Sequence, residues 1–194
     1  MIISNIKVKA KDLRNRSESE KIPADRPGYY KWWASKTDLE RLLVRLDLSF
    51  TQIADYMECS EDFQYCIYVG IAAKESVRSR LNWHINRPCT VSNVKHRTLS
   101  TLKQSISALI CNTMLDSDEI NAFIDCLSVE YYLSDYEIKS EAAISEIKKI
   151  ENSYLKESDK LYILNIQENK HPKACNAQIK TLRKMARENA LNSR

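Results

Sequence analysis

The chain has 194 residues, of which 43% are hydrophobic and 29% are charged. These values are typical of one globular domain, with or without a modest insertion, and they exclude disordered, collagen-like and coiled-coil proteins. No segment approaches the roughly eighteen apolar residues of a membrane span, and the N-terminus turns polar at Ser4 and basic at Lys7, unlike a secretory signal. We therefore expect a cytoplasmic protein without a membrane partner. The net charge of +4 permits a nucleic-acid partner without requiring one.

Two predicted strands lie in the first half of the chain, and each carries one of its only two glycines. Average usage would give about thirteen or fourteen glycines, so both positions need a physical reason. Gly28 opens the aromatic run 28–33 after a proline, which indicates a strand entered from a turn. Gly70 closes a second β-branched and aromatic run, 65–70, where the backbone must bend or approach another group closely. Without further glycines, the chain has no P-loop or dinucleotide-binding fingerprint.

The remaining segments are mostly helical by their apolar periodicity. Residues 1–25 are rich in charge and are expected to be loosely ordered. Residues 37–61, between the two strands, are acidic and carry leucines at helical spacing, which predicts an inserted helical element. The pattern then predicts, in chain order, helices over 71–90 and 98–115, a turn or helix over 118–123, a strand over 127–133, and helices over 139–157 and 173–190.

Positive charge is concentrated in one segment, 74–103, and this is hidden by the small net charge. Arg80 and His84 lie four residues apart and therefore share one face of the predicted helix. A second basic segment begins at Lys173, and it either follows a nucleic-acid backbone or forms a solvated helix face. Apart from Glu75 the first segment has no acid, and its basic residues are Lys74, Arg78, Arg80, Arg87, Lys95, Arg97 and Lys103.

Cysteines and histidines do not form a metal-binding pattern. No two cysteines have the spacing of a zinc site, so we interpret them as structural, and the three histidines form no cluster. The residues are Cys59, Cys66, Cys89, Cys111, Cys126 and Cys175, with His84, His96 and His171.

With these elements in place, the chain resembles the GIY-YIG nucleases. Gly28-Tyr29-Tyr30 stands where that family has Gly-Ile-Tyr, and Tyr68-Val69-Gly70 stands where it has Tyr-Ile-Gly. The next helix of the family carries an arginine followed four residues later by a histidine or tyrosine, which matches Arg80 and His84. The resemblance implies an α/β (α+β) fold with a small three-stranded, mainly antiparallel sheet flanked by helices. The leucine-spaced segment between the first two strands is read as a helical insertion into this fold.

The resemblance extends from about residue 27 to the C-terminal helix. Glu151, on a later helix, matches the single metal-binding glutamate of the family, and Asn165 matches the asparagine that follows it. Two departures stand out. The spacer between the two tyrosine motifs is longer than in the family, and Ile71 stands where a lysine often follows the second motif, which leaves Lys74 as its substitute.

The resemblance implies metal-dependent hydrolysis of DNA phosphodiester bonds. One Mg²⁺ or Mn²⁺ held by Glu151 would stabilise the leaving oxygen, because such hard cations need few protein carboxylates. Tyr68 would be the general base and Tyr30 would hold the attacking water. Arg80 would donate its planar fork to the phosphate, a geometry that lysine lacks. Asn165 would orient the glutamate or a water on the metal.

Several questions stay open at this point. Taken singly, each tyrosine also fits a core position, and Glu151 or the pair of Arg80 and His84 also fits a solvated helix face. His84 or Lys74 could assist the tyrosine base. We expect backbone contacts with nucleic acid from Lys74, Arg78, Arg87, Lys95, Arg97 and Lys103.

The predicted organisation has three parts: an N-terminal extension over 1–25, a nuclease domain over 26–172 with a helical insertion over 34–62, and a basic C-terminal helix over 173–194. The main alternative to an endonuclease is a catalytically inactive DNA- or RNA-binding module on the same scaffold. The sequence determines neither the biological role, nor nicking against double-strand cleavage, nor the oligomeric state.

Overall fold

A four-stranded sheet forms the centre of the molecule. The computed structural model describes residues 2–167 and 169–192. The strands are β1 (Ile2–Lys9), β2 (Gly28–Ala34), β3 (Tyr65–Ala72) and β4 (Ser128–Ser134), in the order β1-β4-β2-β3. All neighbours are antiparallel. The expected small antiparallel sheet is confirmed, with four strands rather than three.

The additional strand is β1, in a segment that we expected to be loosely ordered. Its residues pair with β4 along an edge of the sheet, from Ile2 opposite Ser134 to Lys9 opposite Ser128. Two short helices follow, α1 (Ala10–Arg14) and α2 (Arg16–Ser19). The expectation of loose order was wrong because it rested on the charged residues that follow this strand. An edge strand gains its stability from backbone pairing, which tolerates exposed lysines.

Both glycines lie where two backbones or a backbone and a ring approach closely. Gly70 is paired with Tyr30 across β2 and β3, and a Cβ on Gly70 would lie 2.4 Å from the Tyr30 ring. A Cβ on Gly28 would lie 1.9 Å from the carbonyl oxygen of Tyr132 on β4. Neither position has room for any side chain, which confirms the expected close approach. The pairing also confirms that the two tyrosine motifs form adjacent strands.

Helical turns fill the segment between β2 and β3. They are α3 (Lys36–Leu43), the 3₁₀ turn η1 (Val44–Leu46), α4 (Phe50–Ile53) and the 3₁₀ turn η2 (Ala54–Tyr56). Leu39 and Leu42 are fully buried in the main core, so the leucine spacing predicted the packed face correctly. The helical insertion between these strands is therefore present.

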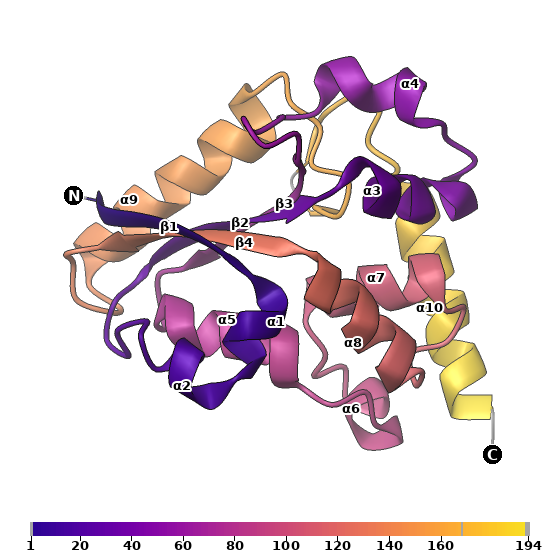
Figure 1. The fold of residues 1–194 in the computed structure, drawn as a ribbon, viewed down its shortest axis with the longest axis horizontal. Helices are drawn as coiled ribbons and strands as arrows, with labels where there is room; N and C mark the ends of the chain where they lie inside the picture. The colour runs from indigo at the N-terminus through magenta and orange to yellow at the C-terminus, as the bar shows by residue number, and fades with distance from the viewer. Residues whose placement is uncertain (1, 168, 193–194) are drawn as a thin grey trace.

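The later elements cover both faces of the sheet (Figure 1). Helix α9 lies on one face, and α5 lies on the other, while α10 packs beside α7 at the far end. Trp32 is in the main core on the α5 side, and Trp33 packs with Leu155 on the α9 side. The bounds are α5 (Val77–Asn86), α6 (Val91–Lys95), α7 (Thr101–Ile110), α8 (Ser117–Cys126), α9 (Glu141–Asn152), the π-helical turn η3 (Ser153–Glu157) and α10 (Asn176–Asn192).

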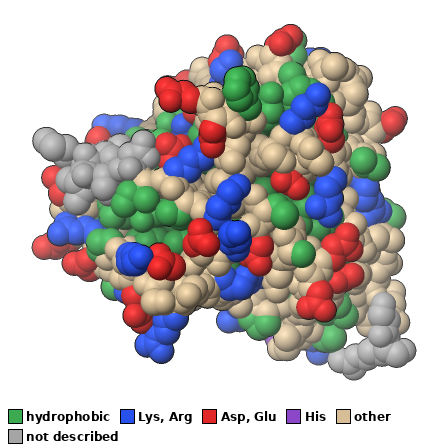
Figure 2. Space-filling model, viewed as in Figure 1, with side chains coloured by type: hydrophobic (Ala, Val, Ile, Leu, Met, Phe, Trp, Pro, Cys, Tyr) green, Lys and Arg blue, Asp and Glu red, His purple; other side chains and the backbone are tan. Residues whose placement is uncertain are grey.

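The surface carries mixed charge. Figure 2 shows lysine and arginine side chains interspersed with aspartate and glutamate over the visible face, as the small net charge leads one to expect. Among the described helices, none combines the length and the apolar character that crossing a bilayer requires.

Candidate active site

A buried tyrosine and a buried histidine form the centre of the predicted site. The Tyr30 hydroxyl, on β2, lies 2.7 Å from Nε2 of His84, on α5, and each side chain is 1% exposed. Burial, followed by the charges of Arg80 and Lys103, lowers the pKa of His84 to about 3. The imidazole is therefore neutral at pH 7. It therefore cannot supply positive charge to a tyrosinate, and its link to Tyr30 is a hydrogen bond between two uncharged groups.

Tyr68 is next to this pair and reaches further outward. Its ring centroid lies 6.5 Å from that of Tyr30 and 5.9 Å from that of His84. The side chain is half-buried, and this burial is the main reason that the pKa of Tyr68 is raised to about 12. The charge of Glu151 also raises the pKa, whereas the charges of Arg80 and Arg183 lower it. The phenol is therefore protonated in the resting protein, and further positive charge or a proton acceptor would be needed to ionise it.

Glu151 is near Tyr68, at the C-terminal end of α9. Its Oε2 accepts a hydrogen bond of 2.6 Å from Nζ of Lys148, one turn earlier. Both side chains border a small polar pocket with a volume of about 100 Å³. Its lining residues are Tyr68, Thr101, Lys148, Glu151, Leu155, Asn165, Ile166 and Gln167. The structure thus brings together three residues that lie far apart in the sequence and that we predicted as site residues: Tyr68, Glu151 and Asn165.

These residues fit a hard divalent cation. Among the described residues, the pocket is lined by one carboxylate together with hydroxyl and amide groups, and oxygen donors of this kind suit Mg²⁺ or Mn²⁺. Glu151 offers a second carboxylate oxygen besides the one that Lys148 contacts. One protein carboxylate is enough for Mg²⁺, which retains several waters in its shell.

Asn165 is held against the outer edge of β3 by its side-chain amide. Its Oδ1 accepts from the backbone N–H of Val69 at 2.8 Å, and its Nδ2 donates to the carbonyl oxygen of Val69 at 2.8 Å. The backbone N–H of Leu164 also donates to the carbonyl oxygen of Ile67, at 2.9 Å. The segment therefore pairs with the outer edge of β3. Both groups of the Asn165 amide bond to Val69, so this residue fixes the strand of Tyr68, and its predicted role in orienting Glu151 or a water on the metal stays a prediction.

Arg80 does not line the pocket of Glu151 but borders a separate one. Its Nη1 is 3.2 Å from Oε1 of Glu75, and its guanidinium lies 4.7 Å from the ring of Trp83. These residues border a larger pocket of about 540 Å³ together with Arg87. Arg80 is close enough to lower the pKa of Tyr68 through its charge. The predicted neighbourhood of arginine and tyrosine is therefore present, although a substrate phosphate would have to compete with Glu75 for the guanidinium.

The predicted nucleic-acid contacts divide into exposed and buried residues. Lys103 is 1% exposed, and its Nζ donates to the carbonyl oxygens of Ile85, at 3.1 Å, and Arg87, at 2.8 Å. Its ammonium stabilises the end of α5 and cannot reach a phosphate in this structure. Lys103 is therefore removed from the predicted contacts with nucleic acid. Periodicity missed this because it does not reveal a lysine that compensates helix-end carbonyls. Arg78 is half-buried, while Lys74, Arg87, Lys95 and Arg97 are exposed.

Sequence reasoning missed two cations near the site. Lys148 pairs with Glu151, and its position three residues earlier on the predicted helix was the available signal. Arg183, on α10, influences the pKa of Tyr68 from a different element than Arg80. The basic character of the C-terminal segment was visible, but the sequence did not show which of its arginines faces inward.

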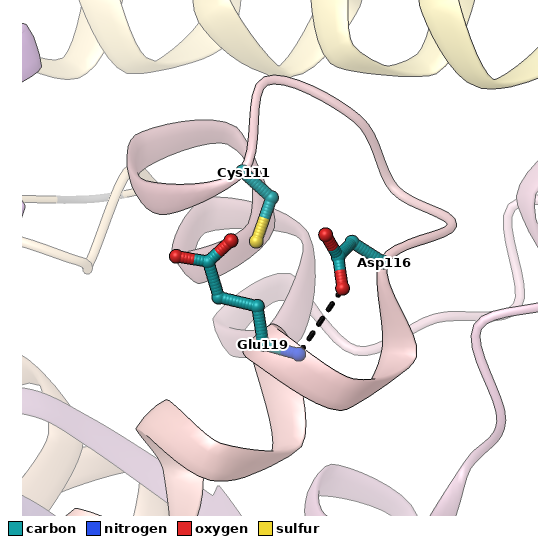
Figure 3. Close-up of side chains that lie close together, drawn as sticks. All are labelled: Cys111, Asp116 and Glu119. Atoms are coloured by element: carbon teal, nitrogen blue, oxygen red, sulfur yellow. Dashed lines mark hydrogen bonds between the residues drawn. The ribbon is translucent and has the colours of Figure 1, made fainter.

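A separate group of potential metal ligands lies at the turn between α7 and α8 (Figure 3). The ligand atoms of Cys111, Asp116 and Glu119 lie within 4.8 Å of one another. Asp116 caps α8 by accepting from the backbone N–H of Glu119 at 3.1 Å. Burial, followed by the two carboxylates, raises the pKa of Cys111 to about 12, so the thiol is protonated. The capping of α8 accounts for the position of Asp116 beside Glu119. Glu151 is not part of this group of side chains.

The comparison with known families agrees with this geometry. A family model described as the GIY-YIG catalytic domain matches residues 28–185. The match covers most of the chain and both tyrosine motifs, so the chain belongs to the GIY-YIG catalytic domain family, whose members are generally nucleases, a class of hydrolases. Neither the curated proteins nor the solved structures contain a significant match.

Proposed function

We propose that the protein is a divalent-metal-dependent endonuclease that hydrolyses phosphodiester bonds of DNA. The observation that carries this proposal is the shared pocket of Tyr68 and Glu151, because it combines a potential proton acceptor with a single carboxylate for a metal. Membership of a family of nucleases supports the same reaction.

Each residue has a distinct task in this proposal. Tyr68 is the general base for the attacking water, because its side chain reaches the pocket while Tyr30 is buried. To accept a proton from the water, Tyr68 must first ionise, so its raised pKa must fall. The positive charge of Arg80 acts in this direction. Arg80 also donates to the oxygens of the scissile phosphate. Tyr30 and His84 form a buried hydrogen-bonded support behind Tyr68.

Glu151 would hold Mg²⁺ or Mn²⁺, which supplies Lewis-acid stabilisation of the leaving oxygen when bound. The protein's own contribution is to place one carboxylate at the lining of this small polar pocket. Lys148, paired with the same carboxylate, holds it toward the pocket.

The test is a supercoiled-plasmid assay with Mg²⁺, with Mn²⁺ and with chelator. We expect metal-dependent nicking or linearisation by the wild-type protein. Glu151→Ala and Tyr68→Phe should each lower the rate at least about a hundredfold, the usual order for loss of a catalytic group. Arg80→Lys should also lose activity, because an ammonium does not replace the guanidinium fork.

Glu146→Ala is the matched control, since Glu146 is exposed on the same helix as Glu151. It should cut at the wild-type rate. If Glu151→Ala cuts as fast as the wild type, the metal assignment is wrong. If the wild type binds DNA but yields no product in either metal, the chain is a binding module on this scaffold instead.

A further inference from the structure

Two arginines of α10 converge on one uncharged acceptor. Nη2 of Arg183 and Nη2 of Arg187 each donate to Oε1 of Gln104, at 2.7 Å in both cases. The two nitrogens therefore cannot lie further apart than twice that distance. Gln104 is buried on α7, and its Nε2 donates to the carbonyl oxygen of Leu99 at 2.6 Å, which fixes the direction of the amide. A neutral side chain thus holds two positive groups together.

Within the part of the chain that the structure describes, no acid pairs with either arginine. Among residues 2–167 and 169–192, the structure has no salt bridge to either guanidinium, and the acid on the same helix, Glu188, pairs with Lys184 instead. Nε of Arg187 is buried without a hydrogen-bond partner. Burial and then the charge of Arg187 lower the pKa of Arg183 to about 10, so Arg183 remains charged at pH 7. Arg187 is charged as well, because a guanidinium group does not lose its proton in proteins. Two like charges at this separation repel, and an anion between them would relieve the repulsion.

The pair is adjacent to the candidate active site. Thr101, which lines the pocket of Tyr68 and Glu151, lies three residues before Gln104 on α7, so the two are one helical turn apart. Arg183 is also within electrostatic range of Tyr68. Both arginines are half-buried, so each keeps a solvent-accessible part.

We propose that Arg183 and Arg187 form a clamp for a backbone phosphate of the nucleic-acid strand, beside the phosphate that is cut. The proposal rests on the proposed function in taking a nucleic acid as the substrate. Guanidinium groups suit this ligand because their fixed N–H donors match phosphate oxygens, and Gln104 presents both groups in one place. A contact of this kind fixes the position of the strand and reads no sequence.

The competing explanation is that the arginines only fasten α10 to α7. That role predicts a loss of stability when they are replaced and no specific effect on nucleic-acid binding. The clamp predicts a loss of binding in a variant that stays folded. Measurements of both properties on the same protein therefore separate the two.

The experiment measures DNA binding in the Glu151→Ala background without metal, so that cleavage does not interfere and a failure of the nuclease proposal leaves the result intact. A 30-base-pair duplex of arbitrary sequence is titrated over a series of salt concentrations. Arg183→Gln with Arg187→Gln should weaken binding about tenfold or more. It should also reduce the slope of log affinity against log salt by about 0.9 for the phosphate contact that is lost.

Lys180→Gln with Lys184→Gln is the matched control. It removes two positive charges, as the arginine variant does, from residues that are also four positions apart but lie on the exposed side of α10. Its slope should stay closer to the wild-type slope than that of the arginine variant. An equal effect in both double variants, unchanged binding in the arginine variant, or no DNA binding by the Glu151→Ala protein would each overturn the clamp.

A second measurement needs no substitution in α10. Phenylglyoxal modifies accessible guanidinium groups, and mass spectrometry gives the rate at each arginine. Bound duplex should slow modification of Arg183 and Arg187, and should leave Arg16, which is exposed on α2, at its free rate. Equal rates at Arg183 and Arg187 with and without DNA would contradict the proposal even if the double variant failed to fold.

Discussion

Burial decides which form of His84 the site contains. An exposed imidazole would change its charge near neutral pH, but His84 is enclosed by Tyr30, Trp32, Tyr68 and Trp83 and faces the cations Arg80 and Lys103. The ring therefore stays neutral in the folded state well below pH 6. Its hydrogen bond to Tyr30 is a contact between two uncharged groups at neutral pH.

This environment predicts a specific dependence of stability on pH. The pKa of His84 is about 3 in the folded protein, against 6.5 for a histidine in water, so between these values the unfolded chain binds a proton that the folded chain does not. The stabilisation is complete above pH 6.5 and is lost as the pH falls toward 3. We expect the wild type to lose up to about 1.4 kcal/mol per pH unit relative to His84→Gln, which does not titrate.

The measurement is urea unfolding of both proteins from pH 7 to pH 4. Glutamine can still reach the Tyr30 hydroxyl with its amide, so both proteins should fold. Parallel curves of unfolding free energy against pH would show that the folded protein protonates His84 as readily as the unfolded chain does. The conclusion that His84 is neutral in the folded protein would then be wrong.

The sequence predicted site residues best where chemistry restricts the residue type. Tyr68 and Glu151 were predicted from the order of short motifs, and the structure places them on one pocket. Lys103 was predicted as a nucleic-acid contact because it belongs to the basic segment 74–103. It is buried because it meets carbonyl oxygens at the end of α5, and such a contact between helices depends on how the chain folds.

At the scale of elements, the outer edge of β3 determines where Tyr68 lies. An edge strand has unpaired backbone groups, and Asn165 satisfies both of those on Val69 with its side-chain amide. A sequence can show an asparagine at a suitable distance from a glutamate, but it cannot show that the amide takes the place of a neighbouring strand. The structure therefore adds a positioning role for Asn165 that the sequence did not indicate, and its predicted role beside Glu151 stays a prediction.

Asn165→Asp tests this positioning role. The carboxylate can still accept from the Val69 N–H, but it cannot donate to the Val69 carbonyl and instead repels it. We expect a loss of about 1–3 kcal/mol in unfolding free energy, the usual cost of a buried unsatisfied polar group. The turnover rate should fall more than the apparent affinity for DNA, because Tyr68 moves while the basic surface stays.

Urea unfolding and steady-state cleavage kinetics provide the two readouts. Asn15→Asp is the control, since Asn15 is the exposed N-cap of α2 and aspartate caps equally well. A variant of Asn165 with wild-type turnover would show that Asn165 does not position the site. If the only change is weaker binding of the metal, the result would instead support the predicted role of Asn165 in orienting Glu151 or a water on the metal.

At the scale of the whole molecule, the N- and C-terminal segments are integrated into the core. The sequence predicted the central strands and most helices because their apolar periodicity reflects local packing. It did not predict β1, whose pairing with β4 joins residues more than a hundred positions apart. Ile179 and Ala186 of α10 are likewise fully buried, although the segment was noted chiefly for its charge.

Integration of the N-terminus leads to a prediction about the boundary at residue 25. Leu13 and Ile22 are buried at 5% and 1% exposure. Arg14 donates to Asp125 at 2.7 Å and to the carbonyl oxygen of Ile85 at 2.9 Å, so the segment joins α8 to the end of α5. Removal of residues 1–25 exposes this surface and the paired edge of β4 together. We expect the shortened chain to lack a cooperative thermal transition, or to aggregate through the exposed strand.

Leu13→Ala is the milder form of the same test, because it leaves the strand in place. It should cost about 2–5 kcal/mol, as other buried leucine truncations do, while the protein remains folded at 25 °C. Circular dichroism during heating measures both variants. If residues 26–194 unfold cooperatively at the wild-type temperature, the N-terminal segment is a separable extension and the sheet of the functional domain needs only three strands.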